Sequence, residues 1–149
     1  MTFRSPTTPC QTISPGRQPD ATATGFARNY YGVKQPPGFP GIPEGWYTEW
    51  ETRVASDGVT KLFTLTHRKK DVEPKRVLIL VHGFGEHVGR YLHFPHYLDS
   101  NGAGIDAVFG YDQRGHGRSE GLRGDAERFD DLADDLEGMI RSVETKFPG

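Results

Sequence analysis

The sequence predicts an α/β domain, a sheet with helices packed against it, and three observations carry that prediction. Residues 46–68 alternate polar with apolar or β-branched residues around a central turn, as an antiparallel hairpin does. Two continuous apolar runs follow, at 77–81 and 105–111, and both suit buried strands. Apolar residues then recur every three to four positions after each run, as on one face of a helix. A hairpin followed by strand, helix, strand and helix is the order of an α/β sheet.

Each strand has its own signal. WYTEWETRVAS and GVTKLFTLTHR form the two arms of the hairpin, and a Ser-Asp-Gly turn at 56–58 joins them. The run 77–81 contains only aliphatic residues, so we expect a strand covered on both faces, as parallel strands between helices are. The run 105–111 is expected to be the next strand, and a polar, glycine-rich loop follows it from 113 to about 124.

Two helices are predicted. The first covers residues 90–101, where Asn101-Gly102 supplies a stop signal and Pro95 is tolerated in the first turns. Its apolar residues are Tyr91, Phe94, Tyr97 and Leu98. The second is a long amphipathic helix, with acidic residues toward its start, where the helix dipole favours them. Its apolar residues are Phe129, Leu132, Leu136, Ile140, Val143 and Phe147.

The first 45 residues differ in composition from the rest. They hold eight of the eleven prolines and six of the nineteen glycines, with few aliphatic residues. Such a segment buries too little apolar surface to offset its ordering entropy. We therefore predict a flexible Pro/Gly-rich leader over 1–45 and a partial domain over 46–149. The stretch GVKQPPGFPGIPEG at 32–45 has an alternative interpretation as a proline-rich ligand for an aromatic groove.

The charge balance and the cysteine content exclude several classes of function. Lys and Arg number 18 against 20 Asp and Glu, so no basic field is available to hold nucleic acid. The single cysteine, Cys10, excludes an internal disulfide and a multi-cysteine metal site. No cofactor is predicted, and no metal, because His82, His87 and His116 lack a matching set of acidic ligands. The longest apolar run is too short for a transmembrane segment and no signal-peptide core is visible, so we expect a cytoplasmic protein.

The stretch GHGRSEG at 115–121 contains GxSxG, a pattern that often marks the nucleophile of a serine hydrolase. Such a nucleophile needs a strand directly before it and a helix directly after it. Here the apolar strand ends at Tyr111, and residues 120–125 lack helical periodicity. We therefore predict that Ser119 is a turn serine whose hydroxyl bonds to loop backbone. The alternative is a nucleophile served by an upstream histidine, since catalytic triads are defined by geometry.

Two longer stretches, HGFGEHVGRY at 82–91 and AVFGYDQRGHGRSEGLRGD at 107–125, carry more information together. They resemble the amino-terminal half of the monoacylglycerol lipase and lysophospholipase branch of the α/β-hydrolases. Members of that branch carry HGxGEHxxRY and then DxRGHGxSxG, and the resemblance covers roughly residues 50–149. DQRG and GRS also resemble the proline iminopeptidases. HGFGEH favours the lipase-like branch, because those peptidases carry a glycine-proline version of the loop.

The resemblance implies the amino-terminal half of an α/β-hydrolase sheet in a serine hydrolase that cleaves small lipid esters through an acyl-enzyme. It places the catalytic serine, aspartate and histidine beyond Gly149, so the domain is expected to be truncated before the nucleophile elbow and inactive alone. The absent half also holds the lid, through which peripheral membrane contact is possible. A non-catalytic, hydrolase-like module is the alternative of a different class.

The candidate site residues lie mainly after the strand 77–81. The backbone N–H of Phe84 is the candidate donor of an oxyanion hole, because glycines on both sides let backbone approach a ligand. His82, Gly83 and Gly85 complete this oxyanion loop, and His82 is expected to anchor it by hydrogen bonds; a plain glycine turn is the alternative. By resemblance, Glu86, His87 and Arg90 lie beside the polar head of the substrate.

Three further expectations concern this loop and the glycine-rich loop after the strand 105–111. Glu86 and Arg90 have an alternative role, in which they fix their turn by pairing with each other. In the second loop, Asp112 and Arg114 are expected to pair with each other. Gly115 and Gly117 are expected to allow a compact turn there.

Overall fold

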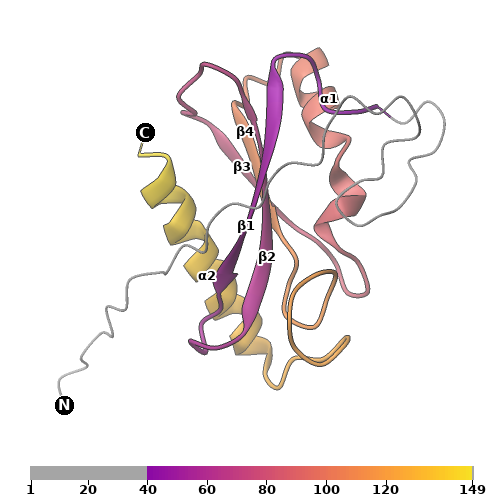
Figure 1. Cartoon of the computed structure of the whole chain (residues 1–149), viewed down its shortest axis with the longest axis vertical. Helices are drawn as coiled ribbons and strands as arrows, with labels where there is room; N and C mark the ends of the chain where they lie inside the picture. Colours follow the sequence, from indigo (N-terminus) through magenta and orange to yellow (C-terminus); the bar gives the residue numbers. More distant parts are fainter. Residues whose placement is uncertain (1–39, 149) are drawn as a thin grey trace.

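The computed structural model describes residues 40–148. The leader predicted over 1–45 and the proline-rich stretch at 32–45 therefore lie almost entirely outside the described residues. From residue 46 onward a hairpin is followed by strand, helix, strand and helix, so the predicted α/β order is confirmed. Helices α1 and α2 lie on opposite sides of one sheet (Figure 1).

The sheet has four strands in the order β1-β2-β4-β3 (Figure 1). Their bounds are Trp46–Val54 for β1, Lys61–Lys69 for β2, Val77–Val81 for β3 and Ala107–Tyr111 for β4. Strands β1 and β2 form the predicted antiparallel hairpin. Strand β4 runs antiparallel to β2 and parallel to β3. Within the described part of the chain β3 therefore has a single neighbour and forms one edge of the sheet.

The hairpin turn is longer than the sequence predicts, because β2 begins at Lys61 rather than at 58. The carboxylate of Asp57 accepts the main-chain N–H groups of Val59 and Thr60, each at 2.8 Å. These two N–H groups are therefore used inside the turn and are not available to a strand ladder.

The helices are Val88–Tyr91, a 3₁₀ segment labelled η1, then Phe94–Ser100 for α1 and Phe129–Lys146 for α2. The single helix predicted over 90–101 is thus split in two. Pro95 explains the break, because its ring clashes with the carbonyl of the residue four positions earlier and it donates no hydrogen bond. At the start of α1 neither restriction costs a bond.

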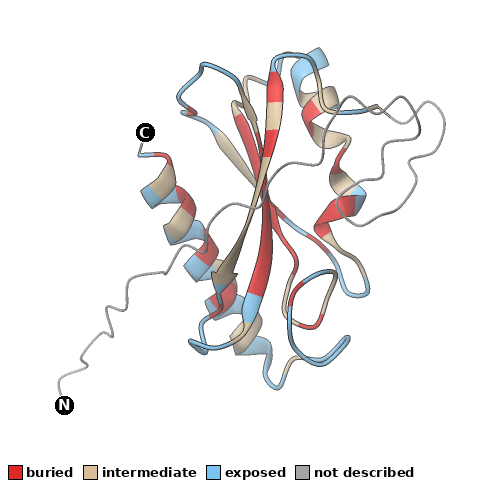
Figure 2. Ribbon diagram, viewed as in Figure 1, coloured by how far each residue is buried: buried red, intermediate tan, exposed pale blue. Residues whose placement is uncertain are grey.

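The core forms on both faces of the sheet, because successive strand residues point to opposite sides. On one face Met139 and Val143 of α2 pack with Leu62 and Phe109. On the other, Leu65 and Leu80 pack with the η1 segment and the residues just after it. Figure 2 shows the buried residues concentrated along the sheet and on the helix surfaces that face it. Each large apolar side chain buried in this way contributes roughly 1.5–3 kcal/mol.

The topology brings two loops together. Strands β3 and β4 are parallel and in register, with Val81 opposite Tyr111. The loop that begins at His82 and the loop that begins at Asp112 therefore leave the same end of the sheet side by side. In α/β sheets, ligands bind outside the carboxyl ends of the strands.

Candidate functional site

The loop after β3 is a tight turn with Phe84 at its tip. The main-chain N–H of Glu86 donates to the carbonyl of Gly83 at 3.2 Å, and Gly85 has φ 71°. A positive φ at the third position of a four-residue turn is what a type II turn requires. Phe84 is 84 % exposed, and within residues 40–148 its N–H makes no backbone hydrogen bond. The turn therefore presents an N–H group at the carboxyl end of β3.

His82 anchors this turn by hydrogen bonds, as the sequence predicts. Its side chain is buried, and its Nδ1 lies 2.8 Å from the carbonyl oxygen of Gly83. Its Nε2 accepts the main-chain N–H of Gln113 at 2.9 Å. The side-chain amide of Gln113 donates to the carbonyl of His82 at 2.5 Å. Gln113 thus ties the loop after β4 to the loop after β3 through both its main chain and its side chain.

The environment of His82 favours the neutral ring. Burial lowers the pKa of the His82 imidazole, and this effect outweighs the hydrogen bond to Gly83, which raises it. A neutral imidazole carries one N–H and one acceptor nitrogen. His82 can therefore accept a hydrogen bond from one partner and donate to another.

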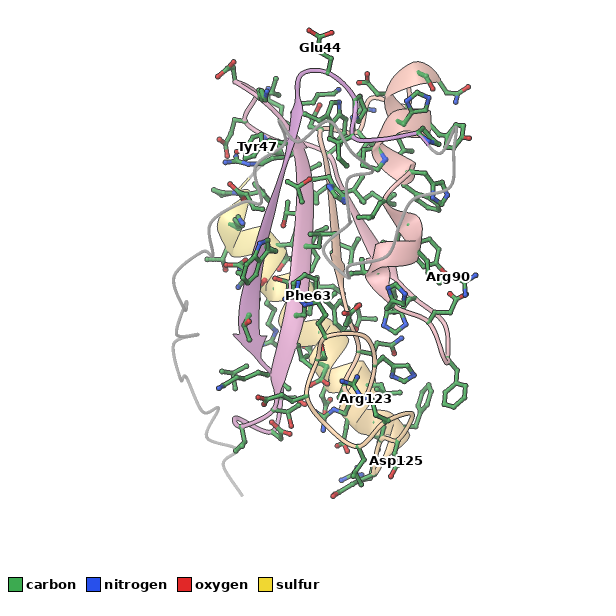
Figure 3. All side chains as sticks on the ribbon, turned by 45° about the vertical axis from the view of Figure 1, so that its right-hand side comes forward. Glu44, Tyr47, Phe63, Arg90, Arg123 and Asp125 are labelled. Atoms are coloured by element: carbon green, nitrogen blue, oxygen red, sulfur yellow. The ribbon has the colours of Figure 1, made fainter. Side chains whose placement is uncertain are left out.

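Glu86, Arg90 and Tyr91 form a polar group beside the turn. Arg90 forms an ion pair with Glu86 at 3.4 Å, and the Tyr91 hydroxyl donates to the other carboxylate oxygen. The Tyr91 hydrogen bond lowers the pKa of the Glu86 carboxyl, and the same bond raises the pKa of Tyr91. Mutual pairing of Glu86 and Arg90 is therefore confirmed. Arg90 is exposed and projects outward from η1 (Figure 3).

His87 lies where the turn joins η1. Its backbone is extended, and its carbonyl accepts the main-chain N–H of Arg90 at 3.1 Å. The His87 backbone therefore starts the η1 segment that carries Arg90 and Tyr91.

Ser119 is a structural serine, as predicted. It is 2 % exposed, its Oγ donates to the carbonyl of Asp112 at 2.5 Å, and it accepts the main-chain N–H of Phe63 at 2.8 Å. Both hydrogen-bonding roles of the hydroxyl are engaged with backbone. In this conformation neither the proton nor a free lone pair of Ser119 faces solvent.

The predicted pairing of Asp112 with Arg114 is wrong. The Asp112 carboxylate is fully buried and accepts the main-chain N–H groups of Val88 and Arg118, each at 2.8 Å. Arg114 instead binds Asp135 of α2 through two nitrogens, at 2.8 and 2.9 Å. Asp112 faces inward because the loop folds back over it and supplies N–H donors, so Arg114 extends toward the acidic residue on the helix.

The compact turn predicted for Gly115 and Gly117 is confirmed. Both have positive φ, 71° and 49°. A β-carbon on Gly117 would lie 2.1 Å from an Asp112 carboxylate oxygen, so only glycine fits beside this buried group.

His116 was not singled out from the sequence as part of the site, yet its ring joins the two loops. It contacts the ring of Phe84 edge-on, with centroids 5.6 Å apart, and lies 5.3 Å from the ring of His82. Its Nδ1 lies 2.9 Å from the carbonyl of Arg114. The sequence Gly115-His116-Gly117, which is part of the pattern DxRGHGxSxG, could have pointed to His116. Gln113 had no such signal, because it occupies an unspecified position of that pattern.

Within residues 40–148 no group of three or more His, Cys, Asp or Glu side chains is arranged to hold a metal ion. Among the same residues no helix is both long and apolar enough to cross a membrane.

The mixed sheet, the helices on both faces and the glycine turn at the carboxyl end of β3 define a class, the α/β-hydrolase fold. A solved structure from Pseudomonas aeruginosa, the hypothetical protein PA2218, shares this arrangement with a TM-score of 0.55 and 15 % identity. The alignment covers 71 % of this chain and 32 % of that one. Within the class, the chain belongs to the family described as serine aminopeptidase, S33, whose model matches residues 72–149.

Two relatives are enzymes by name. The chain is 34 % identical over 70 residues to a monoacylglycerol lipase of Mycolicibacterium smegmatis, covering 47 % of this chain and 24 % of that one. It is 36 % identical over 77 residues to the human monoglyceride lipase, covering 51 % and 24 %. The chain therefore spans about a quarter of the length of these curated relatives.

Proposed function

We propose that this chain supplies the oxyanion loop of a serine hydrolase that cleaves monoacylglycerol- or lysophospholipid-type esters. The observation that carries the proposal is the turn at Phe84, which presents an N–H group at the carboxyl end of β3. In ester hydrolysis the carbonyl oxygen becomes an oxyanion as the nucleophile adds to the carbonyl carbon. A fixed N–H at that position stabilises the transition state more than the substrate.

The reaction needs groups besides this loop. A serine attacks the ester carbonyl, an acyl-serine forms as the alcohol leaves, and water then hydrolyses the acyl-serine. We propose that the serine, the acid and the histidine come from residues beyond Gly149, and that the domain over 46–149 is the part that precedes them. The engagement of both hydrogen-bonding roles of Ser119 supports this proposal. The length of the lipase relatives, about twice that of this chain because the 70 to 77 matched residues make up 24 % of each, also supports it.

The polar group beside the turn supports this substrate class. Glu86 can accept hydrogen bonds from hydroxyl groups, and Arg90 can donate to hydroxyls or to a phosphate. Both side chains reach solvent, and His87 lies between these two residues in the chain. The names of the two lipase relatives support a glycerol ester over other esters.

A peptide substrate is the second candidate, and the family description, serine aminopeptidase, favours it. The two candidates share the oxyanion loop and differ in the leaving group. An enzyme of the first kind hydrolyses monoacylglycerol and leaves amino-acid p-nitroanilides intact, whereas an aminopeptidase does the reverse.

The oxyanion role can be tested in a chimera. Residues 72–149 of this chain replace the matching segment of human monoglyceride lipase, and kcat is measured on a monoacylglycerol. Phe84→Pro removes the N–H group, and we expect kcat to fall about a hundredfold to a thousandfold. Phe84→Ala keeps the N–H group and serves as the matched control, with an expected change below about threefold because Phe84 is exposed.

Thermal unfolding of the two variants separates catalysis from folding. If Phe84→Pro keeps the Tm of Phe84→Ala and also keeps its kcat, the N–H of residue 84 is not an oxyanion donor and the proposal fails. A parallel loss of kcat in both variants would assign the effect to the phenyl ring instead.

A further inference from the structure

We infer that His82 is a positioning residue, which fixes the direction of the Phe84 N–H by holding the other end of the same peptide group. The inference rests on the proposed role of that N–H. It concerns a chain of contacts that begins at Gln113, passes through the imidazole of His82 and ends at the peptide between Gly83 and Phe84.

The first step is the tautomer of His82. The main-chain N–H of Gln113 is a donor and lies 2.9 Å from Nε2. Nε2 must therefore accept, and the single proton of the neutral ring resides on Nδ1. The Gln113 side-chain amide also lies 3.3 Å from Nδ1, but a protonated Nδ1 cannot accept a hydrogen bond, and the amide donates to the His82 carbonyl at 2.5 Å instead.

The second step is the bond from Nδ1. With the proton on Nδ1, His82 donates to the carbonyl oxygen of Gly83 at 2.8 Å. The same oxygen accepts the main-chain N–H of Glu86 at 3.2 Å. Two donors, one before and one after Gly83 in the chain, therefore hold the Gly83 carbonyl in one direction.

The third step follows from peptide geometry. The C=O of Gly83 and the N–H of Phe84 belong to one planar group, and no cis peptide bond occurs among the described residues. In a trans peptide these two bonds point in opposite directions. When His82 holds the Gly83 carbonyl, the Phe84 N–H must point away from the His82 ring.

The fourth step concerns the loop after β4. The donor that sets the tautomer of His82 is the main-chain N–H of Gln113. It is therefore present with any residue except proline at position 113. Its place is set by the loop, which the Asp112 carboxylate and Ser119 hold by buried hydrogen bonds. The His116 ring, against both His82 and Phe84, fills the space between the loops. The second loop thus orients a donor that belongs to the first.

The test uses two substitutions of His82, each of which keeps one of the two hydrogen-bonding functions of the imidazole. In His82→Asn the side-chain amide nitrogen takes the place of Nδ1 and can donate to Gly83. In His82→Gln the amide oxygen takes the place of Nε2 and can accept from Gln113, but nothing donates to Gly83. Both variants remove the imidazole ring and put a neutral amide in its place, and they differ by one methylene group.

The readout is NMR of the full 149-residue chain labelled with ¹⁵N. In the unsubstituted chain, long-range ¹H–¹⁵N spectra should show the His82 proton on Nδ1. The order parameter of the Phe84 N–H should be about 0.85 there and in His82→Asn, and below about 0.6 in His82→Gln. The amides of Phe109 and Tyr111 in β4 report whether each variant is folded.

Two results would overturn the inference. One is a proton on Nε2 in the unsubstituted chain, a result that needs no variant to fold. The other is an equal order parameter at Phe84 in the two folded variants. Neither depends on hydrolysis: if both NMR expectations hold and the Phe84→Pro chimera keeps its kcat, the proposed function fails while the positioning stands.

Discussion

The loops after β3 and β4 leave the same end of the sheet, carry similar glycine-rich sequences and are used in opposite ways. At the tip of the first, Phe84 is 84 % exposed, and its N–H bonds to no backbone group within residues 40–148. In the second, Ser119 is 2 % exposed and its hydroxyl is bonded to backbone on both sides. The loop that contains GxSxG is structural, and the proposed oxyanion donor lies in the loop that lacks it.

In the second loop, the hydrogen bonds that Ser119 makes with backbone indicate its structural role, although the loop contains the GxSxG motif. A buried polar group must find partners, and once found they hold it in place. Asp112 shows this: its carboxylate bonds to Val88 in the first loop region and to Arg118 in its own. The loop after β4 therefore helps to hold the loop after β3 in place.

The largest expected effect is at Asp112. Asp112→Ala leaves one buried and one part-buried N–H group without their charged acceptor, so we expect the free energy of unfolding to fall by about 3–5 kcal/mol. Urea denaturation of the chain measures it, and Glu127→Ala, at an exposed position, is the control. An equal, small change in both variants would mean that the second loop does not support the first.

A β-carbon added to each loop should give the next largest effect. Gly117→Ala places a methyl group against the Asp112 carboxylate and strains a positive φ, for about 3 kcal/mol in all. Gly85→Ala strains a positive φ in open space, for about 1 kcal/mol. The urea concentration at the midpoint of unfolding should therefore decrease more in Gly117→Ala than in Gly85→Ala. The reverse order would contradict the assignment of one loop as packed and the other as open.

A smaller effect is expected at Ser119. Ser119→Ala leaves the N–H of Phe63 without its acceptor, and the expected loss is about 2 kcal/mol. Ser119→Thr keeps the hydroxyl and is the control for its loss. Stability that is unchanged in Ser119→Ala would mean that the hydroxyl is not needed for the fold and is free for another role.

Much of the fold could be predicted from the sequence because strands and helices leave periodic patterns. The hairpin, the strands β3 and β4 and the amphipathic α2 follow from the spacing of apolar residues. The structural role of Ser119 followed from its distance from the end of β4. Both the spacing of apolar residues and the distance of a residue from the end of a strand can be read from a single sequence.

The partners inside the loops could not be predicted in the same way. Asp112 was expected to pair with Arg114, which is two residues away, yet it binds backbone N–H groups that only the folded turn brings to it. Arg114 reaches Asp135, 21 residues further on, because β4 and α2 pack together. Gln113 acts through its main-chain N–H, which every residue but proline has, so no residue type marks it.

The most direct test of the central claim is covalent labelling of the 149-residue chain with a fluorophosphonate. Such a probe reacts with an activated serine hydroxyl, and intact-mass and peptide mass spectrometry locate the adduct. Because both hydrogen-bonding roles of the Ser119 hydroxyl are engaged with backbone, we predict no adduct at Ser119 in the folded chain. A stoichiometric adduct on Ser119, absent after heat denaturation, would show that GxSxG holds the nucleophile and would contradict the account.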